Sequence, residues 1–163
     1  MSDEIRVGSR TIRISNGEKV LFPESGITKR ALVEYYLHVA DTILPHLRDR
    51  PLTMLRYPDG INGQSFFQKD APDYFPKWIK RVRVAKAGGF VSHVVGNNAA
   101  TLVYLANLAC ITPHIWTSRI NHLKQPDLIV FDLDPPEGEF ADVRFAARRL
   151  RELLGDLGLV PFV

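Results

Sequence analysis

Two aspartates stand two residues apart at the end of an apolar run, in the stretch LIVFDLDPPEGEF from Leu128 to Phe140. If the run is a strand, its alternating side chains place Asp132 and Asp134 on the same face, about 6.6 Å apart along the chain. Two like charges so close need compensation, and Mg²⁺ or Mn²⁺ would supply it because hard ions prefer oxygen ligands. Pro135 and Pro136 cannot donate ladder hydrogen bonds, so we expect the strand to stop there and leave the two carboxylates at its end.

The Asp-x-Asp spacing by itself is compatible with several interpretations. A solvated strand edge before a turn would carry the same residues without any site. Haloacid dehalogenase-type phosphatases also end an apolar strand in Asp-x-Asp, usually with a glycine–threonine continuation that this chain lacks, and nucleotide-sugar transferases use the motif to bind a metal. The apolar run before the motif and the prolines after it favour a metal site, with a second ion about 3.5–4 Å away if the chemistry is two-metal phosphoryl transfer.

The composition is that of an ordinary globular protein. The chain has 163 residues, 45% of them hydrophobic and 24% charged, with a net charge of +3, which predicts one domain with a core of its own. The single cysteine, Cys110, excludes a disulfide framework and a cysteine-rich metal site. Because no apolar run approaches the ~20 residues of a membrane span and the N-terminus does not resemble a signal peptide, we expect a cytoplasmic protein without a membrane anchor.

Helical periodicity occurs in three segments. Thr28 has the position of an N-cap, and the helix it begins keeps apolar residues at helical spacing until Pro45. The second segment has little polar face and is expected to be buried. The third has its apolar residues on one face and ends at Gly155. The predicted helices cover residues 28–44, 97–110 and 139–154.

Strand patterns are expected in SRTIRIS, PLTMLR, QSFFQK, WIKRVRV, GFVSHVVG, HIWTSRI and DLIVFDLD. A Pro-Asp-Gly turn after the second favours an antiparallel pair with the third. Without strict β-α-β alternation, the fold class is predicted to be α+β, with a mostly antiparallel sheet flanked by helices. Residues 1–13 are expected to be a flexible start. The closing LGLVPFV stops at Val163 as an unpaired strand start, so we expect a truncated domain.

Three motifs, in this order, resemble the polymerase domain of bacterial DNA ligase D, a member of the archaeo-eukaryotic primase superfamily that works in non-homologous end joining. They are SNGEKVLFPESGITKRALVEYY, RPLTMLRYPDGINGQSFFQKDAP, and LIVFDLDPPEGEF followed by VRFAARRLRELLGDLGLVPF. The resemblance runs from about Ile14 to Val163. It implies a primase-polymerase-like fold, of which residues 1–163 would be the N-terminal part.

The resemblance also implies which residues bind each part of the substrate. The metal-binding catalytic aspartates would be Asp132 and Asp134. The residue that contacts the phosphates of the incoming nucleotide would be His114. The residues that hold the 5′-phosphate of the downstream DNA strand would be Asn16, Lys19 and Lys29. The residues that contact the template would be Phe66, Phe67 and Arg56.

Physical chemistry is consistent with these roles. A 5′-phosphate carries about −1.5 to −2 charges at neutral pH, and lysines offer compact positive charges to it. Phe66 and Phe67 are adjacent on a predicted strand and would face opposite ways, so we expect one of them in the core and the other free to stack on a base. Such stacking contributes about 1–3 kcal/mol and accepts any base.

The resemblance implies metal-dependent transfer of nucleotides to a 3′-hydroxyl at 5′-phosphorylated gaps or double-strand breaks. The cofactor would be Mn²⁺ or Mg²⁺, the substrate a ribo- or deoxyribonucleoside triphosphate, and the location the nucleoid. Expected partners are DNA, the bacterial Ku protein, and ligase and nuclease domains. The family's third catalytic aspartate and a triphosphate-binding turn have no counterpart here. A second hypothesis is therefore a non-catalytic module that binds DNA 5′-phosphate ends, and a third is an Asp-x-Asp metal-dependent phosphatase or sugar transferase.

Overall fold

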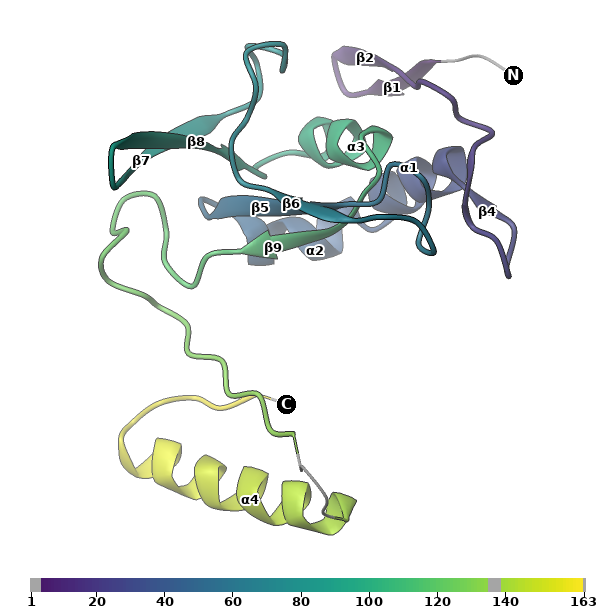
Figure 1. The fold of residues 1–163 in the computed structure, drawn as a ribbon. Coiled ribbons are helices and arrows are strands. Elements are labelled where there is room, and N and C mark those ends of the chain that lie inside the picture. Colours follow the sequence, from purple (N-terminus) through teal and green to yellow (C-terminus); the bar gives the residue numbers. More distant parts are fainter. Residues whose placement is uncertain (1–3, 135–138, 163) are drawn as a thin grey trace. The chain divides into compact units, whose positions relative to one another are not determined.

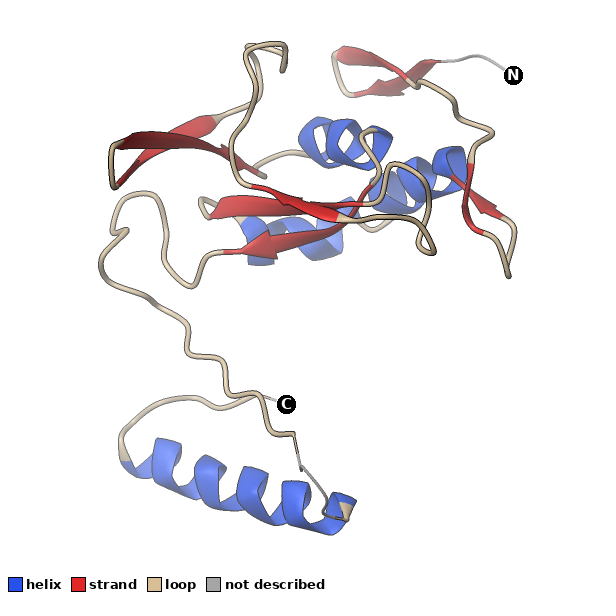
Figure 2. Ribbon diagram, viewed as in Figure 1, coloured by secondary structure: helices blue, strands red, loops and turns tan. Residues whose placement is uncertain are grey.

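The computed structural model describes residues 4–134 and 139–162 (Figure 1). It divides into two compact units, unit 1 over Met1–Leu128 and unit 2 over Ile129–Val163. Helices and antiparallel strands are mixed in unit 1, so the predicted α+β class is confirmed (Figure 2). In the part of the chain that the structure describes, no helix is long and apolar enough to cross a membrane.

Unit 1 opens with a β-hairpin. Strands β1 (Glu4–Val7) and β2 (Arg10–Arg13) pair antiparallel, with Ile5 opposite Ile12. Residues 4–13, which were expected to belong to a flexible start, form this hairpin, and Val7 and Ile12 alternate with polar residues and are buried in the core. Residues 1–3 lie outside the described part.

A short two-stranded ribbon and two helices follow. The ribbon pairs β3 (Val20–Phe22) with β4 (Ile27–Thr28), two strands that the sequence patterns did not predict. The predicted helix 28–44 is divided at Val39 into α1 (Lys29–His38) and α2 (Ala40–Leu47). Thr28 is confirmed as the N-cap of α1, since its hydroxyl oxygen accepts from the Ala31 N–H at 3.2 Å. Pro45, expected beyond the helix, lies inside α2.

The main sheet consists of β5, β6, β7, β8 and β9, all antiparallel, in the order β6-β5-β8-β7, with β9 on β5. Its strands cover Pro51–Arg56, Phe66–Gln68, Arg81–Lys86, Gly89–Val95 and Cys110–Ile115. The last strand begins before the predicted HIWTSRI and ends within it. Leu52 and Met54 point to one face of β5 and are fully buried, whereas Thr53 and Leu55 on the opposite face are half-buried.

Helix α3 (Ala99–Asn107) is buried along most of its length, as predicted. Asn98 caps it by accepting from the Thr101 N–H at 2.9 Å. Its apolar residues belong to the same core as those of α1 and β5, and Figure 1 shows α1 and α3 close together in unit 1. This core holds the elements that carry the candidate site of unit 1.

Unit 2 contains α4 (Phe140–Asp156), which extends past the predicted end at Gly155. None of its described residues is buried. The strand predicted in DLIVFDLD is wrong: residues 127–134 have no regular structure, and Val130 is 77% exposed. A strand needs a neighbouring strand for its backbone N–H and C=O groups, and no described strand pairs with this segment. The Asp127 and Leu128 N–H groups both donate to the Thr117 carbonyl, at 3.1 and 3.3 Å.

Candidate functional site

A turn before β3 is attached to the first residues of α1. The Lys19 N–H donates to the Asn16 carbonyl at 3.0 Å, and Asn16 has a φ of 51°, in the left-handed region that asparagine tolerates better than most residues. The Lys29 N–H donates to the Lys19 carbonyl at 2.8 Å, and the Arg30 N–H to the Gly17 carbonyl at 2.9 Å. These backbone bonds bring Asn16, Lys19 and Lys29 together, although the two lysines are ten positions apart in the sequence.

Lys29 is a buried cation with a backbone oxygen as its partner. Its Nζ donates to the Ser15 carbonyl at 2.8 Å, and the Ser15 N–H donates to Oδ1 of Asn107 at 2.9 Å. Burial lowers the pKa of Lys29, and the charges of Lys19 and Arg56 lower it further. An anion bound among these three cations would raise the pKa of Lys29 again, because a nearby negative charge favours the protonated amine.

A pocket of about 260 Å³ is lined by four of the predicted residues: Asn16, Lys19, Lys29 and Arg56. Asp59 also lines it, and its Oδ1 lies 2.7 Å from Nζ of Lys19. Three cations and one carboxylate therefore surround the space, which suits a multiply charged anion. Sequence analysis placed Arg56 only beside the template, so its position here is an addition.

Arg56 connects the pocket to β6. Its Nε donates to the Leu108 carbonyl at 2.8 Å and its Nη1 to Oε1 of Gln68 at 2.6 Å. The guanidinium carbon lies 5.3 Å from the centroid of the Phe66 ring, within the range of a cation–π interaction. One side chain thus contacts both the anion pocket and the first of the two predicted template aromatics.

An aromatic ring and a histidine meet on the less buried face of the sheet. Leu55 pairs with Phe67 on one side of β5, and Thr53 pairs with His114 on the other, which places both rings on the same face. The ring centroids of Phe67 and His114 are 5.4 Å apart, at an interplanar angle of 62°. The two predicted residues therefore form one exposed surface.

The prediction that one of the adjacent phenylalanines enters the core is wrong. Phe66 is 43% exposed and Phe67 is 61% exposed. β6 is three residues long and lies at the end of the sheet order, and Phe66 is covered by Arg56 rather than by the core. Both rings are available to a ligand on their own face of the strand.

Asp132 and Asp134 are exposed and lie in unit 2. No ion pair between described residues involves either carboxylate, and no group of three or more metal-ligating side chains exists among them. Carboxylate oxygens are the ligands that a hard divalent ion prefers, so the two aspartates are suitable metal ligands. Two side chains alone do not complete the coordination of such an ion. Because the segment is not a strand, their same-face arrangement stays a prediction. Pro135 and Pro136 lie outside the described residues.

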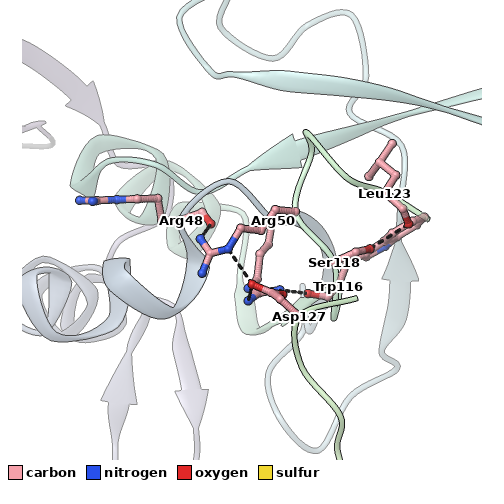
Figure 3. Close-up of polar contacts among 7 residues, drawn as sticks. Arg48, Arg50, Trp116, Ser118, Leu123 and Asp127 are labelled. Atoms are coloured by element: carbon pink, nitrogen blue, oxygen red, sulfur yellow. Dashed lines mark hydrogen bonds and ion pairs between the residues drawn. The ribbon is translucent and has the colours of Figure 1, made fainter. Parts of the chain in front are cut away.

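A buried arginine holds the end of unit 1 to the start of β5 (Figure 3). Arg50 is 2% exposed and binds Asp127 through two nitrogens, at 2.6 Å and 2.9 Å, while Nη1 also donates to the Trp116 carbonyl at 3.2 Å. Arg119 Nε donates to the same carboxylate at 2.8 Å. Hydrogen bonds from Arg50 and Arg119 lower the pKa of Asp127 to about 2. This cluster fixes the residue five positions before Asp132.

Sequence reasoning did not find Asp59, Asn107, Arg50 or Asp127. Asn107 is a buried polar residue in a mostly apolar helix, and this pattern could have marked it as a hydrogen-bonding residue of the interior. Asp59 lies in the Pro-Asp-Gly turn, where aspartate has an ordinary local reason to occur. Nothing local distinguishes it as a pocket residue.

Comparison with known proteins gives consistent matches. The family model described as "LigD, primase-polymerase domain" matches residues 28–163. The multifunctional non-homologous end joining DNA repair protein LigD of Mycobacterium tuberculosis (strain ATCC 25618 / H37Rv) is 34% identical, over 93% of this chain and 21% of that protein. The bifunctional non-homologous end joining protein LigD of Bacillus subtilis (strain 168) is 32% identical, over 93% of this chain and 24% of that protein.

A solved structure, the polymerase domain from Mycobacterium tuberculosis ligase D in complex with DNA, matches with a TM-score of 0.76 and 29% sequence identity. The match covers 91% of this chain and 55% of that one. The chain spans about a fifth to a quarter of the length of the curated relatives it matches.

Proposed function

Because the chain belongs to the LigD primase-polymerase domain family, we propose that it captures 5′-phosphorylated DNA at gaps and broken ends for a repair polymerase. The anion pocket of unit 1 carries this proposal. Lys19, Lys29 and Arg56 surround it, so a dianionic phosphate would gain several charge-assisted contacts. Its negative charge would also favour the protonated form of Lys29, whose pKa burial lowers. The matched mycobacterial polymerase domain was solved in complex with DNA, which supports DNA as the ligand class.

The test measures, by fluorescence anisotropy at one salt concentration, how tightly the protein binds a gapped duplex that carries either a 5′-phosphate or a 5′-hydroxyl. The protein should prefer the phosphorylated end, and Lys19→Met or Lys29→Met should each weaken its binding by about tenfold, because a hydrogen bond to a charged group is lost. Lys124→Met removes the same charge from an exposed position outside the pocket and is the matched control. Equal affinity of the protein for both ends rejects the proposal.

The exposed sheet face is proposed to receive the template and the incoming nucleotide. Phe67 would stack on a base, and Phe66 would do so together with Arg56, whose guanidinium lies over its ring. His114, edge-on to Phe67, would donate to a phosphate oxygen of the nucleoside triphosphate. Phe67→Ala should weaken template binding by a similar factor on every sequence, since stacking does not depend on the base.

Asp132 and Asp134 are proposed to be the residues that hold Mg²⁺ or Mn²⁺. The bound ion would activate the 3′-oxygen and neutralise phosphate charge during nucleotidyl transfer. Primer extension on the 5′-phosphorylated gapped duplex with Mn²⁺ tests this assignment. Asp132→Ala should abolish extension, and extension that persists in this variant refutes the metal role.

The wider system follows from the family. We propose that the protein acts in non-homologous end joining in bacteria, with the Ku end-binding protein and with ligase and nuclease domains. Nucleoid DNA would be its place of action. Co-purification of the protein with Ku on linear but not on circular DNA is the corresponding measurement.

A second function has one specific observation in its favour. Among the described residues no three metal-ligating side chains come together, and the alternative proposal is that this polypeptide by itself is an end-binding module rather than a complete polymerase. Under this alternative, the 5′-phosphate preference persists while the parent protein extends no primer with either Mg²⁺ or Mn²⁺. Extension by the parent would reject it.

A further inference from the structure

The anion pocket already contains an anion of its own. Asp59 Oδ1 lies 2.7 Å from Nζ of Lys19, in a pocket whose other charged groups are Lys29 and Arg56. The side chain of Asp59 is 75% exposed and that of Lys19 is 37% exposed. A 5′-phosphate that binds Lys19 therefore competes with the Asp59 carboxylate for the same ammonium group.

The backbone that carries Asp59 is fixed. The Gly60 N–H donates to the Tyr57 carbonyl at 3.0 Å, and the Ile61 N–H donates to the Leu21 carbonyl at 2.7 Å. Gly60 has a φ of 89°, and a Cβ there would lie 3.0 Å from the Leu21 carbonyl oxygen, so the close approach of turn and strand needs glycine. The turn holds the backbone of Asp59 beside the pocket, while its side chain is mostly exposed to solvent.

From this arrangement we propose that Asp59 is an internal counter-ion, which the DNA 5′-phosphate displaces from Lys19 on binding. This inference rests on the proposed function of the pocket. It adds that binding is an exchange of anions, in which Asp59 lowers the affinity for phosphate and eases its release. Three cations facing one carboxylate leave two positive charges in excess, which matches the charge of a terminal phosphate better than that of a singly charged phosphodiester.

The exchange is energetically feasible because the pair is exposed. Exposed ion pairs contribute little to stability, so Lys19 can release Asp59 at small cost. A terminal phosphate offers Lys19 a larger negative charge, and it can at the same time contact Lys29 and Arg56. The displaced carboxylate then rotates into solvent, from where it still repels the phosphate weakly.

The test compares Asp59→Asn with the parent protein on the gapped duplex with a 5′-phosphate or a 5′-hydroxyl. Removal of the competing charge should tighten binding of the phosphorylated duplex by about three- to tenfold. Asparagine keeps the size of the side chain and is common in turns, so the fold should be retained. Asp41→Asn is the matched control, since it makes the same charge change at an exposed position of α2 away from the pocket.

Further outcomes make the result specific. In a Lys19→Met background, Asp59→Asn should no longer tighten binding appreciably, because the ammonium for which the two anions compete is gone. If Asp59→Asn weakens binding of the phosphorylated duplex, Asp59 orients Lys19 instead, and the proposal is overturned; a change no larger than that of Asp41→Asn also overturns it. If the parent does not distinguish phosphate from hydroxyl, the proposed function of the pocket fails and the exchange fails with it.

Discussion

Unit 1 and unit 2 have the same kind of amphipathic sequence but different burial. In unit 1, alternate residues of β5 such as Leu52 and Met54 are fully buried in a core shared with α1 and α3. In unit 2, α4 has an apolar stripe, yet Phe145 is 62% exposed and Leu153 is 56% exposed. A stripe of apolar residues thus predicts a helix, but it becomes part of a core only where another element offers a matching surface.

The largest expected difference concerns independent folding. A polypeptide of residues 1–128 should unfold cooperatively, because its core lies within those residues. A peptide of residues 129–163 should be mostly unfolded in water, since an isolated helix of the length of α4 is marginal. Circular dichroism during thermal unfolding measures both, and a cooperative transition in the peptide would contradict the comparison.

Thiol reactivity gives the next largest effect. Cys110 is 1% exposed, and burial raises the pKa of its thiol to about 12, so neither access nor thiolate is available in folded unit 1. A cysteine introduced by Val130→Cys, at an exposed position of unit 2, should react with a thiol reagent about a thousandfold faster, given the usual stability of a domain. Similar rates at the two positions would show that the core of unit 1 opens readily.

Core and surface substitutions should differ by a few kcal/mol. Leu52→Ala removes a fully buried side chain and should lower the free energy of unfolding by about 2–5 kcal/mol. Leu153→Ala, in α4, should change it by no more than about 0.5 kcal/mol, because its side chain already contacts water. Urea denaturation of the whole chain measures both, and comparable losses would mean that Leu153 is packed in solution.

The smallest effect is a pH dependence at the end of unit 1. Hydrogen bonds from Arg50 and Arg119 lower the pKa of Asp127 to about 2, below its unfolded value of 3.8. The stability it contributes is therefore present above about pH 4 and is lost as the pH falls towards 2. Asp127→Asn should flatten the decrease in unfolding midpoint over that range, with Asp142→Asn, an exposed carboxylate of α4, as the control. If the unfolding midpoint of Asp127→Asn falls with pH as steeply as that of the parent, Asp127 is not the source of the pH dependence.

Several elements could be predicted from local sequence because local chemistry causes them. Thr28 caps α1 through a bond to Ala31, three residues away, and the alternation of PLTMLR sets which side chains of β5 face the core. Where only a neighbour in space decides, prediction failed. Phe66 and Phe67 are both exposed: the Phe66 ring is contacted by Arg56 rather than by the core, and Phe67 lies beside His114 on the less buried face of the sheet.

For the site, the residue types and their motifs were visible in the sequence, and through the family resemblance Lys19, Lys29 and His114 were identifiable before any geometry was known. Their partners were not. Asp59 lies forty positions from Lys19, and Asp127 lies seventy-seven from Arg50. Local patterns determine which backbone conformation a segment prefers and which face is apolar. Only the tertiary structure brings distant charges within hydrogen-bonding distance, because that depends on how the packed elements turn the chain back on itself.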